Sequence, residues 1–178
     1  MIRTSSPVFS IISALALFVA AEASADMLAP GTAMPEWSMK DHNGTLVRSS
    51  DLAGKTYLLY YYPKAQTPGC TTEARGMRDN FAALTQAGVT VLGVSFDGPE
   101  ANKAFVEAES LPFKLLSDED HKLAIATGAA NWSWSMWASR ISYLVGPDGK
   151  IIKAYDKVDP ATHAPQVLRD VKAIAPPK

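Results

Sequence analysis

The chain has 178 residues, with 17 basic and 18 acidic side chains and 47% hydrophobic residues. This is an ordinary globular composition, without the basic excess of a nucleic-acid-binding protein or the like-charge blocks of a disordered tail. The single cysteine excludes an internal disulfide.

The first 25 residues resemble a secretory signal peptide. Arg3 supplies a positive charge, Val8 to Ala21 is apolar apart from two serines, and Ala23-Ser24-Ala25 fits the small-residue cleavage pattern. The apolar run is shorter than the roughly 18 residues of a membrane span, which disfavours an anchor. We therefore expect cleavage before Asp26, export to the periplasm without stable membrane association, and one domain over residues 26–178.

The next residues predict a hairpin followed by a buried strand. Two short alternating runs within residues 36–48 flank Asn43-Gly44, the strongest local hairpin signal. Residues 49–54 predict a helical turn closed by Gly54. Residues 56–62 are β-branched or aromatic and apolar on both faces, as in a central strand covered on both sides.

Helices and strands then alternate to the end of the chain. Helical spacing of apolar residues predicts helices over 70–87, 99–109 and 160–174, and the acidic N-cap region 117–120 predicts a further helix that follows it and ends near Thr127. Residues 89–95 and 113–116 predict strands, and Pro147-Asp148-Gly149 predicts a hairpin between strands 141–145 and 151–155. This order predicts an α/β, thioredoxin-like fold, with a central mixed β-sheet flanked by helices and an N-terminal β-hairpin extension.

Cys70 lies where a strand runs through a Pro/Gly-rich turn into a helix. Thr67 suits the N-cap and Pro68 the first helical position, so Cys70 falls in the first turn. Unpaired N–H groups and the helix dipole favour a thiolate there, and a nearby arginine would favour it further. Thr67 would share a helical face with Cys70. From composition alone, a buried and inert cysteine is an equal alternative.

The spacing Pro63-x-x-x-Thr67-x-x-Cys70 resembles the active-site motif of the peroxiredoxins. The wider run from Tyr61 to Ala74 is similar to the bacterioferritin-comigratory, or peroxiredoxin Q, branch, and the likeness continues through residues 76–80, 88–95, 113–121 and 140–150. The resemblance implies a thiol peroxidase that reduces hydrogen peroxide and organic hydroperoxides. Its cysteine becomes a sulfenic acid that a thiol resolves.

The resemblance also implies roles for individual residues. Cys70 would be the peroxidatic cysteine, Thr67 the hydroxyl that holds the peroxide, and Pro63 the shield against water. Arg140 resembles the active-site arginine, the alternative being an ordinary strand-end arginine. Glu73 resembles a carboxylate that orients this arginine, the alternative being a first-turn acid suited to the helix dipole.

The chain departs from its branch at Arg75, where many members carry a resolving cysteine. With no second cysteine, resolution needs an external thiol: a small thiol, a thioredoxin-like protein or another copy of the chain. Family analogy suggests a monomer. Trp132, Trp134 and Trp137 also cluster just before Arg140. They either pack on the sheet edge or form an aromatic wall, with Trp134 and Trp137 selecting apolar hydroperoxides or docking a reductant.

Other chemistries lack their motifs. The three histidines, His42, His121 and His163, show no metal-ligand spacing, and neither Cys-x-x-Cys nor a phosphate-binding glycine loop occurs. We therefore expect no metal and no cofactor. The alternative to a peroxidase is a non-enzymatic thioredoxin-like redox sensor or thiol-binding module built on Cys70.

Overall fold

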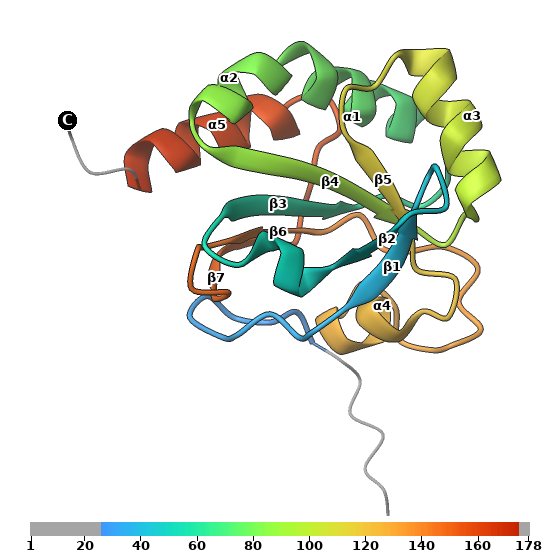
Figure 1. The fold of residues 1–178 in the computed structure, drawn as a ribbon, viewed down its shortest axis with the longest axis horizontal. Coiled ribbons are helices and arrows are strands. Elements are labelled where there is room, and N and C mark those ends of the chain that lie inside the picture. The colour runs from blue at the N-terminus through green and yellow to red at the C-terminus, as the bar shows by residue number, and fades with distance from the viewer. Residues whose placement is uncertain (1–25, 175–178) are drawn as a thin grey trace, which may run out of the picture.

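The computed structural model describes residues 26–174, so the predicted signal peptide lies outside the described residues. They form a seven-stranded sheet in the order β2-β1-β5-β4-β3-β6-β7, with helices on both faces (Figure 1). The strands are β1 (Ser38–Asp41), β2 (Leu46–Arg48), β3 (Thr56–Tyr61), β4 (Val89–Ser95), β5 (Lys114–Ser117), β6 (Ser142–Val145) and β7 (Ile151–Tyr155). The helices are the 3-10 turn η1 (Ser49–Leu52), α1 (Pro68–Asp79), α2 (Phe81–Gln86), α3 (Pro99–Glu109), α4 (Lys122–Thr127) and α5 (His163–Ile174).

The sheet is mixed, as predicted. Strands β3, β4 and β5 run parallel to one another, whereas β6 pairs antiparallel with β3 and β1 pairs antiparallel with β5. The hairpins β1–β2 and β6–β7 therefore form the two edges. The predicted α/β class, the central position of β3 and the N-terminal hairpin are confirmed.

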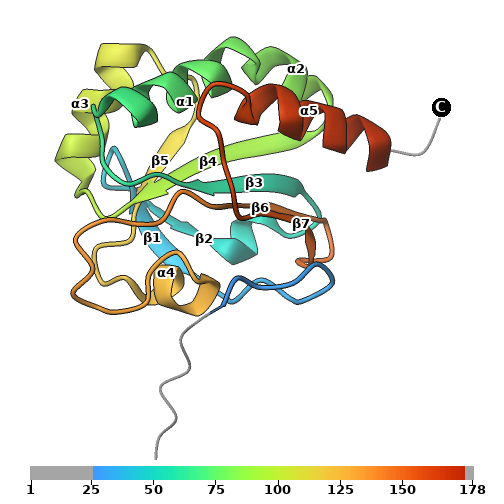
Figure 2. The same cartoon turned by 180° about the vertical axis from the view of Figure 1, so that it is seen from behind.

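Alternate side chains of β3 enter two separate cores. Tyr57, Leu59 and Tyr61 pack beneath the sheet with residues of α4 and the loop 128–141. Leu58, Tyr60 and Tyr62 pack above it with residues of α1, α3 and α5. The view from behind shows α1, α2, α3 and α5 over one face and α4 with the N-terminal segment over the other (Figure 2). Two-sided burial explains why β3 has no alternating pattern.

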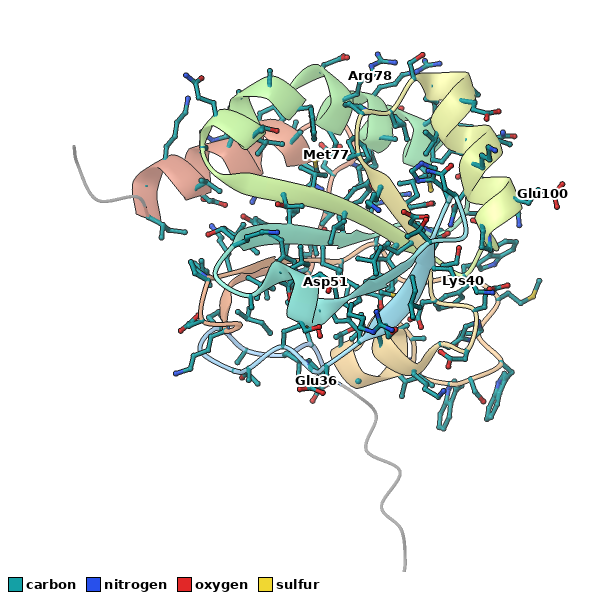
Figure 3. The ribbon with its side chains drawn as sticks, viewed as in Figure 1. Glu36, Lys40, Asp51, Met77, Arg78 and Glu100 are labelled. Carbon is teal, nitrogen blue, oxygen red and sulfur yellow. The ribbon has the colours of Figure 1, made fainter. Side chains whose placement is uncertain are left out.

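Helix α1 begins at Pro68 and ends before Asn80, so the predicted helix over 70–87 is wrong in its extent. Asn80 has non-helical backbone angles, and its side-chain Nδ2 donates to the Gly76 carbonyl over 2.9 Å. Asparagine side chains compete with the helical hydrogen-bond pattern in this way. On α1, Met77 points toward the sheet and Arg78 points outward (Figure 3).

Two other predicted helices are present, and the second starts later than the sequence indicated. Helix α4 begins at Lys122, and its N-cap is His121, with φ of 58°, one residue after the predicted N-cap region Ser117–Asp120. Helix α5 begins at His163 rather than Pro160. Asp159 accepts the backbone N–H groups of Ala161, Thr162 and His163, which forms a turn before the helix.

Candidate active site

Cys70 lies in the first turn of α1, and its side chain is buried, with only 1% of its surface exposed. Thr67 takes the extended N-cap conformation and Pro68 follows at the start of the helix. The Thr67 carbonyl accepts the N–H of Thr71 over 2.8 Å. The sulfur therefore sits at the positive end of a helix, where N–H groups have no helical partner and a negative charge is favoured.

Arg140 comes from the segment before β6 and reaches Cys70. Its Nη2 lies 3.3 Å from the Cys70 sulfur, and its side chain is 17% exposed. Burial alone would lower the pKa of Arg140, but Glu73 and Cys70 beside it raise the pKa above its ordinary value. The guanidinium therefore stays charged next to the sulfur.

Gly69 makes room for this contact. A Cβ atom at that position would lie 3.3 Å from Arg140 Nη2 and 3.9 Å from Pro160 Cγ. The first of these separations is tighter than an ordinary van der Waals contact. A larger residue at position 69 would therefore press on the guanidinium that faces the sulfur.

Glu73 is buried behind Arg140. One carboxylate oxygen pairs with Arg140 Nη1, and the other lies 2.8 Å from Nδ1 of the fully buried His163. Because α1 starts at Pro68, Glu73 lies in the second turn, so its interpretation as a first-turn acid is wrong. The structure thus brings Cys70, Arg140, Glu73 and His163 into one connected line.

Thr67 occupies the predicted N-cap position of α1. Its side chain makes no capping bond, because Thr67 Oγ1 donates to the Lys64 carbonyl over 2.9 Å. Its oxygen remains available to accept another hydrogen bond. Pro63 is half-buried directly after Tyr62. Gln66 has φ of 61°, an uncommon conformation for a residue other than glycine.

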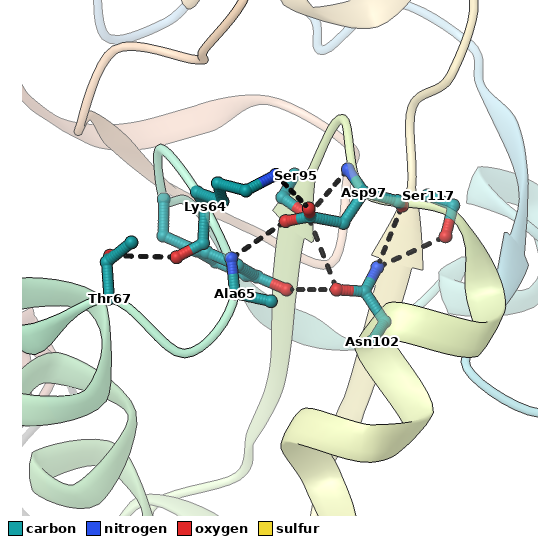
Figure 4. Close-up of polar contacts among 8 residues, drawn as sticks. Lys64, Ala65, Thr67, Ser95, Asp97, Asn102 and Ser117 are labelled. Atoms are coloured by element: carbon teal, nitrogen blue, oxygen red, sulfur yellow. Dashed lines mark hydrogen bonds and ion pairs between the residues drawn. The ribbon is translucent and has the colours of Figure 1, made fainter.

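Asp97 and Asn102 fasten this loop to the sheet (Figure 4). Asp97 accepts the N–H of Ala65 over 2.8 Å and pairs with Lys64 Nζ at 3.3 Å. The buried Asn102 accepts the Tyr62 hydroxyl over 2.6 Å. Burial raises the pKa of Tyr62 well above its ordinary value, so this hydroxyl keeps its proton and donates. Both ends of the turn that carries Pro63 are therefore held.

The tryptophan cluster is exposed, so the interpretation that it packs on the sheet edge is wrong. Trp134 is 73% exposed, Met136 74%, Trp137 49% and Trp132 42%. Trp132 and Trp134 stack with ring centroids 5.2 Å apart. Lys64 Nζ lies 5.3 Å from the centroid of Trp137, which joins the cluster to the loop before Cys70.

Sequence reasoning did not identify His163, Asp97 or Asn102 as parts of this region. His163 lies 90 residues from Glu73 in the sequence, and no local pattern links the two. Asn102 did carry a signal. It lies on the same helical face as Phe105 and Val106, where a polar side chain needs buried partners.

The described residues contain no group of three or more His, Cys, Asp or Glu side chains placed to hold a metal ion. Within residues 26–174, no helix has the length and apolar character needed to cross a membrane. The contact between Arg140 Nη2 and Cys70 Sγ can support the chemistry of a thiolate beside a fixed cation.

Comparison with known proteins gives consistent matches. The model of the family described as AhpC/TSA matches residues 30–154. Peroxiredoxin Bcp of Escherichia coli K12 is 42% identical over 150 residues, which cover 82% of this chain and 96% of that protein. The crystal structure of peroxidoxin BcpB from Mycobacterium tuberculosis superposes with a TM-score of 0.78 at 26% identity, covering 85% of this chain and 100% of that one.

A third relative has been studied for its alkyl peroxide reduction activity. This protein, the bacterioferritin comigratory protein of Xanthomonas campestris, superposes with a TM-score of 0.73 at 29% identity. The match covers 84% of this chain and 98% of that one.

Proposed function

Because the chain belongs to the AhpC/TSA family, within its Bcp/peroxiredoxin Q branch, and is a thiol-dependent peroxidase, we propose that Cys70 is the sulfur that peroxide oxidises. The observation that carries this proposal is the 3.3 Å contact between Arg140 Nη2 and Cys70 Sγ. A charged guanidinium at that distance stabilises a thiolate, which is the reactive form of cysteine. A buried cysteine that stays an uncharged thiol would not require a charged side chain next to its sulfur.

The reaction follows from this arrangement. The Cys70 thiolate attacks the nearer oxygen of a hydroperoxide, so an S–O bond forms and the O–O bond breaks. The sulfur is oxidised to a sulfenic acid, and the peroxide is reduced to an alcohol or water once the leaving oxygen has taken up a proton. Arg140 stabilises the charge on that leaving oxygen.

Thr67 and Pro63 position and protect the reactants in this proposal. The hydrogen of the Thr67 hydroxyl is committed to the Lys64 carbonyl. Its oxygen can therefore accept the O–H of the incoming peroxide, which turns the peroxide oxygens toward the sulfur. Half-buried Pro63 limits water at the same place and offers no N–H that would compete for the thiolate.

The sulfenic acid is then reduced from outside the chain. The sequence contains one cysteine, so the thiol that condenses with the sulfenic acid belongs to a small thiol, a thioredoxin-like protein or a second copy. The product is a mixed disulfide and water, and a second external thiol releases Cys70. The chain works as a monomer in this proposal, by analogy with its branch.

Trapping the oxidised sulfur tests the assignment. After one equivalent of peroxide, mass spectrometry with dimedone should show a sulfenic acid adduct on Cys70, and a panel of dithiothreitol, glutathione and thioredoxin should sustain turnover with at least one reductant. Cys70→Ser should abolish both signals. A free thiol at Cys70 after peroxide treatment would overturn the assignment. Oxidation without turnover under every reductant would favour the non-enzymatic redox sensor instead.

We further propose that Trp134 and Trp137 favour apolar hydroperoxides. Both rings are exposed, and Trp137 contacts Lys64 in the loop that precedes Cys70. The alkyl peroxide reduction activity of the Xanthomonas campestris protein supports this substrate class. Trp134→Ala should lower the ratio of kcat/KM for cumene hydroperoxide to that for hydrogen peroxide. Leu46→Ala removes another exposed apolar side chain, on β2, and should leave the ratio unchanged. Equal ratios in both variants would refute the proposal.

Export is the remaining part of the proposal, and the N-terminal sequence pattern supports it. Expression of the full chain with its N-terminus should yield a periplasmic protein that begins at Asp26. N-terminal sequencing of the fractionated protein decides this. A protein that keeps residues 1–25 in the cytoplasm would contradict both cleavage and export.

A further inference from the structure

We propose that His163 is a positioning residue for peroxide reduction, because it holds Glu73 in the orientation that Glu73 needs to hold Arg140 against the Cys70 sulfur. The inference rests on the proposed roles of Cys70 and Arg140. It assigns a role to a side chain of α5 that never touches the sulfur itself.

The contacts form an unbroken line from α5 to the sulfur. His163 Nδ1 lies 2.8 Å from Glu73 Oε1, Glu73 Oε2 pairs with Arg140 Nη1, and Arg140 Nη2 lies 3.3 Å from Cys70 Sγ. Each oxygen of the carboxylate therefore has one partner. With both oxygens held, the carboxylate plane is fixed, and so is the guanidinium that pairs with it.

The geometry favours a hydrogen on Nδ1 of His163. The side chain is fully buried, and within residues 26–174 no group pairs with its Nε2. A hydrogen on Nε2 would be a buried donor without an acceptor, whereas a hydrogen on Nδ1 has the Glu73 carboxylate as its acceptor. We therefore take His163 as a donor to Glu73 through Nδ1.

Aromatic packing fixes the ring itself. The Tyr155 ring meets His163 edge-on at 5.4 Å between centroids, and the Tyr155 hydroxyl donates to Asp170 on the same helix over 3.0 Å. Tyr155 of β7, which is bonded to Asp170 of α5, therefore packs against the imidazole. A donor held this firmly can set the direction of Glu73.

Loss of this donor would leave Glu73 Oε1 as a buried carboxylate oxygen without a partner. The carboxylate would then turn toward other donors, and Arg140 would lose its fixed place beside Cys70. A displacement of about 1 Å from the reacting geometry can cost about 100-fold in rate. We therefore expect His163→Leu to lower kcat/KM for hydrogen peroxide by about 10- to 100-fold and to reduce the ultraviolet thiolate absorbance at pH 7.

Conservative variants separate positioning from packing. In His163→Asn the amide N–H lies close to the place of Nδ1, so this variant should keep kcat/KM within about threefold of the original. His163→Gln moves the amide one carbon farther and should behave like His163→Leu. Val167→Ala opens a cavity in the same core on the same helix and removes no hydrogen-bond donor. It should lower the melting temperature and leave kcat/KM unchanged.

A double-mutant cycle tests whether His163 acts through Glu73. If it does, Glu73→Gln with His163→Leu should lose no more activity than Glu73→Gln alone. Additive losses, or full activity in a folded His163→Leu variant, would overturn the inference. If His163→Leu does not fold, equal activity of the Asn and Gln variants would overturn it. Peroxidase activity that survives Cys70→Ser would instead overturn the proposed function.

Discussion

Replacing Arg140 with glutamine should remove the charge that stabilises the Cys70 thiolate. Unit charges 3.3 Å apart attract each other by about 5 kcal/mol at an effective dielectric constant of about 20. Arg140 is partly exposed and also serves Glu73, so the realised effect is smaller. A neighbouring opposite charge changes the ionisation of an acid by about 10- to 1,000-fold. We expect Arg140→Gln to lower kcat/KM for hydrogen peroxide by a factor in that range of about 10- to 1,000-fold.

Two measurements separate a loss of thiolate from a loss of reactivity toward peroxide. Ultraviolet thiolate absorbance at pH 7, with Cys70→Ser as the blank, reports ionisation, and stopped-flow peroxide consumption reports the reaction. Arg75→Gln is the matched control, because the exposed Arg75 lies on α1 and pairs with Glu109 of α3 rather than with the sulfur. Thiolate absorbance and kcat/KM of Arg140→Lys should lie between those of Arg140→Gln and Arg75→Gln, because lysine keeps the charge and loses the guanidinium fork that joins Glu73 to Cys70. Unchanged absorbance and unchanged kcat/KM in Arg140→Gln would refute the reasoning.

Two further changes have defined expectations. Thr67→Val removes the acceptor proposed for the peroxide and should lower kcat/KM about tenfold or more. Thr72→Val is the control: it loses a similar hydroxyl bond, to the Pro68 carbonyl over 2.9 Å, away from the sulfur, and should leave kcat/KM unchanged. Equal activities of the two variants in steady-state assays would exclude the proposed role of Thr67. Burial raises the pKa of Asp118 above its ordinary value of 3.8 despite donors from Ala124 and Tyr61, so its ionisation costs stability as the pH rises through the raised pKa. Asp118→Asn should therefore gain free energy of unfolding relative to the original protein between pH 4 and pH 7 in urea titrations. Asp120→Asn should lose it as the pH rises from acid values, because the Lys122 hydrogen bond lowers the pKa of Asp120, and a trend of the same sign in both variants would contradict this account.

Local patterns were sufficient for the part of the fold that carries the sulfur. The apolar run of β3, the turn after it and the helix start at Pro68 all follow from residue types within a few positions. The motif spacing also placed Thr67 and Cys70 at the start of one helix. The predicted Arg140 partner lies beside Cys70, although only the family resemblance, and no local pattern, pointed to it.

Contacts between distant segments were beyond the reach of local patterns. Glu73 meets Arg140 across 67 residues and His163 across 90 residues. A single sequence gives the two residues of such a contact but does not indicate that they lie next to each other in the fold. The break at Asn80 was missed for another reason, because apolar spacing continued through a residue whose side chain bonds to the backbone.

Arg75 stands where the family resemblance implies a resolving cysteine in many members. Residues five apart in a helix are separated by a rise of about 7.5 Å, which exceeds the roughly 7 Å between Cα atoms that a disulfide can bridge. A cysteine at this position would therefore require α1 to unwind before it could meet Cys70. Arg75 instead holds Glu109 of α3 through two bonds, of 2.6 and 3.1 Å, and Arg78 donates to the Glu109 carbonyl over 2.8 Å.

These bonds fasten the second half of α1 to α3, whereas the first turn carries the sulfur. An external thiol needs access only to that turn, which is bounded by Gly69, the loop 62–67 and Arg140. The bonds from α1 to α3 are thus consistent with the proposed external reductant: a thiol from outside would approach the sulfur, and the helix would not have to unwind to bring a second sulfur to it.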